Sequence, residues 1–303
     1  MGHDHNHGAE KRNYDKAFAV GILLNTVFIT AEIIYGLQAN SLALLADAGH
    51  NAGDVLGLVL AWGATILAKR KSSERFTYGL QSSTIMASMT NAIFLLVAVG
   101  GIAWEAVGRL KNVEAAINTQ TVIWVAFLGI LINGITAWFF VSGSKKDLNI
   151  RGAFLHMAAD ALVSLGVVIS GIVMMKTGWL IIDPIVSLVI ALVIVIGTWK
   201  LLVDSVKLSL HGVPENIDYS EVKAYLSSLE NVKEVHDLHI WAMSTSDVAL
   251  SAHILLSCNP DSNFLKEIEH ELEHDFGINH STIQIELLGN SAEKCEIVKR
   301  HNH

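Results

Sequence analysis

The stretch LADAGHNAGDVLGL, residues 45–58, places charged side chains inside a long apolar run. Asp47, His50, Asn51 and Asp54 follow one another at positions i, i+3, i+4 and i+7, which puts all four on one face of an α-helix. Each Asp at the centre of a membrane helix raises the free energy of insertion by about 2.5–3.5 kcal/mol. The stretch therefore predicts a membrane helix whose buried charges have a function.

The whole chain has the composition of a membrane protein. Of its 303 residues, 51% are hydrophobic, and the mean hydropathy is +0.43. Both values are high for a soluble protein. A membrane core of about 30 Å needs roughly 20 apolar residues in a helix. Six segments are predicted to span it: Ala17–Leu37, Leu42–Leu67, Gln81–Trp104, Thr121–Val141, Gly152–Met175 and Ile181–Val203.

The basic residues gather on one side of these predicted spans, and that side is expected to be cytosolic. It receives Lys11, Arg12, Lys16, Lys69, Arg70, Lys71, Arg75, Lys145, Lys146, Arg151, Lys200 and Lys207, and the other side Arg109, Lys111 and Lys176. Both termini are then cytosolic, and the short loops favour a bacterial inner membrane. The net charge of −8 offers no basic surface for nucleic acid.

The last third of the chain reads as a small soluble domain. Helices are predicted at Asp218–Glu230 and Asn263–Phe276, and strands at Val235–Met243, Val248–Leu256 and Ser281–Leu287. The order αββαβ indicates an open-faced α+β sandwich. The predicted organisation is an N-terminal tail (1–16), a six-helix membrane domain (17–207), a cytosolic domain (208–290) and a C-terminal tail (291–303).

The fifth predicted span repeats the spacing of the second, because His156 and Asp160 also lie four residues apart. Two residues from each helix can converge on one point. Two imidazoles and two carboxylates then form a tetrahedral shell with bonds of about 2.0–2.2 Å. This ligand set suits Zn²⁺ and suits Mg²⁺ or Ca²⁺ poorly. Cd²⁺, Co²⁺, Ni²⁺ and Fe²⁺ remain open.

The same ligands allow release of the metal, because binding requires neutral His and ionised Asp and protons compete for both. The pattern therefore predicts a secondary transporter that exchanges a divalent metal for protons. The alternative for the paired residues is a proton relay or hydrogen bonding between helices. Other polar residues in the spans are expected to bond between helices: Asn25, Glu32, Asn91, Glu105, Asn133 and Asp183.

Three other functions were weighed against metal transport. An intramembrane zinc protease needs an HExxH motif, which the chain lacks, so no enzyme is predicted. An antiporter of organic cations needs acidic residues in the spans but no paired histidines. A metal sensor that does not transport remains open, and uptake into vesicles separates it from a carrier.

The motifs resemble those of the cation diffusion facilitator family, in its zinc-transporting branch. They are SLALLADAGHNAGD and HMAADALVSLG in the spans, and VHDLHIWAMS, SAHILL and HSTIQIE in the soluble part. The resemblance implies a homodimer with six membrane helices per protomer and a metallochaperone-like cytosolic domain. It also implies export of Zn²⁺ in exchange for protons, with His50, Asp54, His156 and Asp160 as the transport site. Asp47 would be a neighbour of that site.

The resemblance further implies a regulatory zinc site at His236, His253 and Glu286. Zn²⁺ would then be both substrate and regulator. Some members of the family bind metal in the loop between the second and third spans. That loop, AKRKSSERFTYG, has no histidine here, so no such site is predicted. The terminal histidines, which are His3, His5, His7, His301 and His303, are expected to gather metal weakly.

Overall fold

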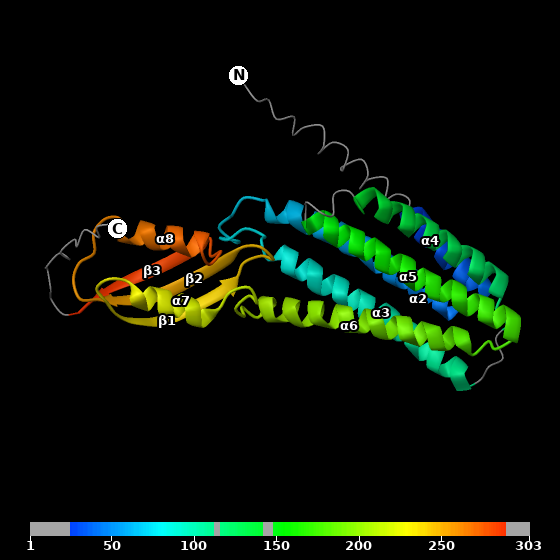
Figure 1. Cartoon of the computed structure of the whole chain (residues 1–303). Helices are drawn as coiled ribbons and strands as arrows, with labels where there is room; N and C mark the ends of the chain where they lie inside the picture. Colours follow the sequence, from blue (N-terminus) through cyan, green and yellow to red (C-terminus); the bar gives the residue numbers. More distant parts are fainter. Residues whose placement is uncertain (1–24, 112–115, 142–147, 289–303) are drawn as a thin grey trace, which may run out of the picture. The chain divides into compact units, whose positions relative to one another are not determined.

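The computed structural model describes residues 25–111, 116–141 and 148–288, and Figure 1 shows their helices and strands. The chain divides into two compact units, and each is described by itself. The first unit takes the chain up to residue 60 together with residues 90–201. The second takes residues 61–89 and the chain from residue 202 onward.

Long helices make up the first unit, although residues 61–68 of α2, 83–89 of α3 and 202–209 of α6 belong to the second. A helical segment at residues 25–39 is followed by α2 (Leu42–Ala68), α3 (Ser83–Lys111), α4 (Thr119–Val141), α5 (Leu148–Thr177) and α6 (Ile182–Ser209). α4 and α5 run side by side (Figure 1), and side chains of α2 contact side chains of α5. The predicted spans match these helices, but α3 and α6 continue about two turns further at their C-terminal ends.

Five of the described helices, α2 to α6, are long and apolar enough to cross a membrane. The first predicted span, Ala17–Leu37, lies partly outside the described residues, so five spans rather than the predicted six are seen. Large apolar side chains point outward from these helices, as lipid contact requires. Trp62, for example, is 71% exposed and Val97 is 69% exposed.

Small residues let the helices of the first unit approach closely. A Cβ added at Gly53 would lie 2.7 Å from the Cδ1 atom of Leu95. α2 therefore lies directly against α3 one residue before Asp54. Apolar side chains from the helices fill the remaining core, and they include the fully buried Leu44, Val122 and Val167.

The second unit contains the predicted αββαβ domain, which the structure confirms. Its elements are α7 (Tyr219–Ser228), β1 (Val232–Ala242), β2 (Val248–Leu256), α8 (Phe264–His274) and β3 (His280–Leu287). The sheet has the order β1-β2-β3, with β1 antiparallel and β3 parallel to β2. α8 thus provides the crossover between two parallel strands (Figure 1).

Both helices of this domain cover one face of the sheet. Side chains of α7 and α8 share one core with alternate residues of β2: Val222, Leu226, Ile268, Leu272, Leu250 and Ile254. Since successive side chains of a strand point to opposite faces, Ser251 and His253 lie on the uncovered face. The sandwich is open on one side, and polar residues can gather there.

Candidate functional site

Side chains on the polar face of α2 contact side chains of α5 within the first unit. α2 contributes His50 and Asp54, and α5 contributes His156 and Asp160. Each pair is spaced by four residues, so its two side chains lie on the same face of their helix. The structure brings all four predicted residues together.

The contacts between the two helices are cross-wise. The Nε2 atom of His50 lies 3.4 Å from Oδ1 of Asp160, and Nε2 of His156 lies 3.3 Å from Oδ2 of Asp54. Within each helix the corresponding separations are 3.8 and 3.7 Å. Ligand atoms at the corners of a tetrahedron with bonds of about 2.0–2.1 Å are about 3.3–3.4 Å apart. His50, Asp54 and Asp160 each offer one ligand atom within 4.8 Å of the others, and His156 contacts both carboxylates of this group.

The four side chains differ in burial. The Asp160 side chain is 3% exposed, whereas those of His50, Asp54 and His156 are 24%, 32% and 41% exposed. Within the described residues, the buried Oδ2 of Asp54 has no hydrogen-bond donor. A buried carboxylate oxygen without a donor needs a proton or a cation. The arrangement can therefore hold either.

A second layer of polar residues surrounds this group. Asp47, which is fully buried, accepts a hydrogen bond of 2.9 Å from Ser164 of α5. Asn51 donates to Oε2 of Glu32 over 3.3 Å, and Glu32 is also fully buried. Helical spacing predicted the position of Asp47 beside the site. The spacing of residues within α2 could not place Glu32 beside the site, because Glu32 belongs to a different helix.

A second group of histidines and carboxylates lies on the uncovered face of the sheet. His236 of β1 is paired with His253 of β2, and their rings are 5.3 Å apart between centroids. Glu286 of β3 lies between them, because its Oε1 is 2.9 Å from His253 Nδ1 and its Oε2 is 3.5 Å from His236 Nε2. One ligand atom from each residue lies within 4.8 Å of the others. This set could hold a metal ion.

A β-bulge in β1, beside this group, breaks the alternation of side chains between the two faces of the sheet. The register with β2 shifts between His236 and His239, and Asp237 has a φ of 49°. Because of the bulge, His236 and His239 are both on the uncovered face although they are three residues apart. Asp237 Oδ1 lies 2.9 Å from His239 Nε2, and this contact lowers the pKa of the Asp237 carboxyl. Asp237 is a site neighbour that strict strand alternation missed.

The remaining histidines are separate from these two groups. The ring of His280 packs edge-on against Tyr78, at 5.5 Å between centroids. In α8, His274 contacts the neighbouring Asp275, which raises the pKa of the imidazole. The histidines near the two termini lie outside the described residues.

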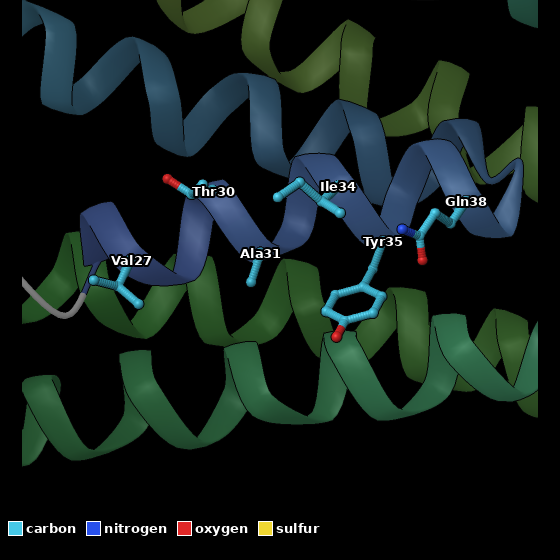
Figure 2. A pocket seen from close by; sticks show the side chains of 6 residues that line it. All are labelled: Val27, Thr30, Ala31, Ile34, Tyr35 and Gln38. Carbon is cyan, nitrogen blue, oxygen red and sulfur yellow. The ribbon is translucent and has the colours of Figure 1, made fainter.

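Figure 2 shows a pocket on the first helical segment that serves neither group. Its walls are formed by Val27, Thr30, Ala31, Ile34, Tyr35 and Gln38. None of these residues is a histidine, cysteine or acid, so the pocket lacks the usual ligands of zinc. The candidate site is the cluster between α2 and α5.

The chain is similar to known cation efflux proteins. Residues 18–208 match the cation efflux transmembrane domain, and residues 214–287 match the cytoplasmic domain of cation efflux proteins. The cadmium, cobalt and zinc/H(+)-K(+) antiporter of Bacillus subtilis is 34% identical, and the alignment covers 100% of both chains.

Two further relatives are similar over most of their length. The zinc transporter ZitB of Escherichia coli is 32% identical over 100% of this chain and 99% of its own. The metal cation efflux system protein CzcD of Cupriavidus metallidurans is 34% identical over 94% of this chain and 90% of its own. The chain therefore belongs to the cation diffusion facilitator family, in its zinc-transporting branch.

Proposed function

We propose that the protein exports Zn²⁺ from the cytosol in exchange for protons. The observation that carries this proposal is the convergence of two imidazoles and two carboxylates between α2 and α5. Zn²⁺ bound there is the substrate. Two ionised carboxylates balance its charge, and neutral imidazoles complete a tetrahedral shell.

Protons complete the cycle in this proposal. When the site opens toward the side of higher proton activity, His50 and His156 take up protons and become imidazolium ions. Each then faces a carboxylate of the opposite helix, at N–O separations of 3.4 and 3.3 Å. The positive charge of the metal is thereby replaced, and no carboxylate is left buried without a partner. Competition between protons and metal for the same atoms couples the two fluxes.

The ligand set favours a metal that can leave. It contains no thiolate, which is the soft ligand that holds zinc and cadmium most firmly. Zn²⁺ is the proposed substrate, and Cd²⁺ and Co²⁺ are further candidates because the Bacillus subtilis relative is named for all three.

For the membrane arrangement we propose six spans within residues 17–207, of which the first, Ala17–Leu37, lies partly outside the described residues. The cytosolic domain occupies residues 208–290 between the membrane domain and a C-terminal tail, and a tail of residues 1–16 precedes the first span. The Lys and Arg distribution supports cytosolic termini. A bacterial inner membrane is the proposed location, and bacterial relatives support it.

The cytosolic domain is proposed to make the protein a homodimer with a regulatory zinc site. Bound zinc would be held by His236, His253 and Glu286, whose ligand atoms cluster on the open sheet face. A metal that binds one conformation of the cytosolic domain more tightly shifts the population toward that conformation. Cytosolic zinc would thereby set the transport rate.

Transport into proteoliposomes tests the proposal. Zinc uptake is measured with and without a pH gradient for the wild type and for Asp54→Asn and Asp160→Asn. We expect wild-type uptake to rise with the gradient and uptake by both variants to fall to the level of empty vesicles. Asp218→Asn is a matched control, since Asp218 caps α7 far along the chain from the site. Wild-type zinc flux in the Asp54 and Asp160 variants would refute the site.

A further inference from the structure

The carboxylate of Asp183 is buried at the start of α6 and is bonded to a different helix. Asp183 is 0% exposed. Its Oδ2 accepts a hydrogen bond of 2.7 Å from the backbone N–H of Leu42, and its Oδ1 accepts one of 3.4 Å from the N–H of Ala43. The hydroxyl of Ser41 also donates to Oδ1 over 2.5 Å. Asp183 thus caps the first turn of α2 from α6.

α2 does not need this carboxylate in order to begin. Ser41 already acts as its local N-cap, because its Oγ accepts a hydrogen bond of 3.2 Å from the N–H of Leu44. Asp183 accepts hydrogen bonds from the two backbone N–H groups of this turn that do not donate to the serine. The additional cap fixes the start of α2 to α6, with the positive end of the α2 dipole facing a buried negative charge.

The residue before Ser41 is fixed to further helices. Asn40 has a φ of 55°, so the chain makes a sharp turn there. Arg109 near the end of α3 donates to the carbonyl oxygen of Asn40 over 2.7 Å and to its side-chain oxygen over 2.8 Å. Ala39 accepts from the N–H of Asn118, just before α4, over 3.0 Å. The start of α2 is therefore bonded to three other elements.

This junction lies at the end of a rigid element that carries half of the transport site. His50 follows Leu42 by about 12 Å along the axis of α2, and Asp54 by about 18 Å, at a rise of about 1.5 Å per residue. Metal–ligand distances tolerate shifts of only about 0.2 Å. A tilt or slide of α2 at its start therefore moves both ligands away from His156 and Asp160 of α5.

We propose that Asp183 is a positioning residue for the transport site. It holds the start of α2 on α6 so that His50 and Asp54 meet the ligands of α5. This inference rests on the proposed function of that site. Asp183 does not touch the metal, and it acts only through α2.

The test uses full-length protein in which His236→Ala and His253→Ala remove the cytosolic cluster in every sample. Asp183→Asn removes the charge and turns an N–H₂ group toward donors. Asp183→Glu keeps the charge but is one methylene longer. Asp204→Asn, the same change further along α6, is the matched control. Zinc KM and kcat are measured in proteoliposomes, and the visible absorption of bound Co²⁺ reports the geometry of the four ligands.

We expect Asp183→Asn to elute as the wild type does, to raise the zinc KM at least about 10-fold and to weaken the tetrahedral Co²⁺ absorption. Asp183→Glu should lie between this variant and the wild type, and Asp204→Asn should match the wild type. A folded Asp183→Asn protein with wild-type KM and Co²⁺ spectrum would overturn the inference. If that variant does not fold, wild-type values in Asp183→Glu would overturn it. Absence of zinc transport by the chain without any substitution would instead count against the proposed function.

Discussion

The two histidine–carboxylate clusters of this protein use similar ligands on different supports. The cluster between α2 and α5 joins helices that are about 100 residues apart in the chain, and Asp160 in it is 3% exposed. The cluster on the sheet joins neighbouring strands, and its side chains His236, His253 and Glu286 are 40%, 30% and 35% exposed. His50, Asp54 and His156 are 24%, 32% and 41% exposed, so the two clusters differ in burial at Asp160, whose carboxylate needs a proton or a cation as its partner.

This difference fits the two functions that we propose for the clusters. A site whose charge must always be balanced exchanges one cation for another, as transport requires. A site that water can enter is either empty or occupied by zinc, depending on the cytosolic zinc concentration. Regulation requires this dependence.

The largest effect is expected for a ligand of the membrane cluster. Replacement of His156 by Ala removes one corner of the tetrahedron and leaves Asp54 without its partner at 3.3 Å. Zinc kcat/KM should fall at least about 100-fold, since even partners of metal ligands alter affinity or activity by about 10–100-fold. Stopped-flow uptake with a zinc dye measures this. Retention of more than a tenth of wild-type kcat/KM would count against His156 as a ligand.

A smaller effect is expected for Asp47, which we propose is a neighbour of the metal ligands and not itself a ligand. Asp47→Asn keeps an oxygen that can accept the bond from Ser164 but removes the negative charge. Zinc kcat/KM should fall about 10-fold. Ser164→Ala, which leaves the charge and removes the bond, is the paired variant. If Asp47→Asn abolished transport as completely as His156→Ala, Asp47 would belong among the ligands.

The cytosolic cluster should alter regulation while the maximal rate stays the same. His253→Ala removes the contact of 2.9 Å with Glu286. The zinc concentration for half-maximal activation should rise about fivefold or more, within the usual range of coupling between sites. His270→Ala in α8, outside the cluster, serves as control. Unchanged activation by zinc in His253→Ala would remove the basis for a regulatory site there.

The smallest effect concerns the turn between β1 and β2. Asp247 accepts hydrogen bonds from Ser244 Oγ at 2.6 Å and Asn279 Nδ2 at 2.8 Å, and these lower the pKa of its carboxyl. The ionised form therefore stabilises the fold above the ordinary pKa of 3.8, and this is lost as the pH falls through the lowered value.

Asp247→Asn should lower the melting temperature of the cytosolic domain by about 2–4 °C at pH 7. The difference from the wild type should shrink when the pH drops below 3.8. Calorimetry of the full chain across this pH range measures both. A difference that grew toward acid pH would show that the carboxylate is not the stabilising form.

The periodicity of the sequence predicted most of the features that depend on a single helix or strand. The spacing of His50 and Asp54, and of His156 and Asp160, placed each pair on one helix face before the fold was known. The requirement to balance buried charge then predicted that the two faces meet. The β2 strand, Val248–Leu256, was predicted with its observed bounds for the same reason, since alternation along a strand is a local property.

Hydrogen bonds between helices were expected of Glu32 and Asp183 and are present, but their partners on the other helices were not predicted. Glu32 approaches Asn51 only because the first helical segment packs beside α2. Asp237 joins the cytosolic cluster through a bulge, which breaks the alternation that strand prediction assumes. The bonds from Asp183 to the start of α2 connect residues 141 positions apart. Helix or strand period carries no information about such pairs.

The most direct test of the central claim is zinc binding by the purified full-length dimer. Stoichiometry and pH dependence are measured in a protein that carries His236→Ala and His253→Ala, with and without Asp160→Asn. We expect Asp160→Asn to remove one bound Zn²⁺ per protomer, and we expect this ion to bind more weakly as the pH falls, with release of protons on binding. Equal zinc stoichiometry in the two proteins, or an affinity independent of pH, would contradict the central claim.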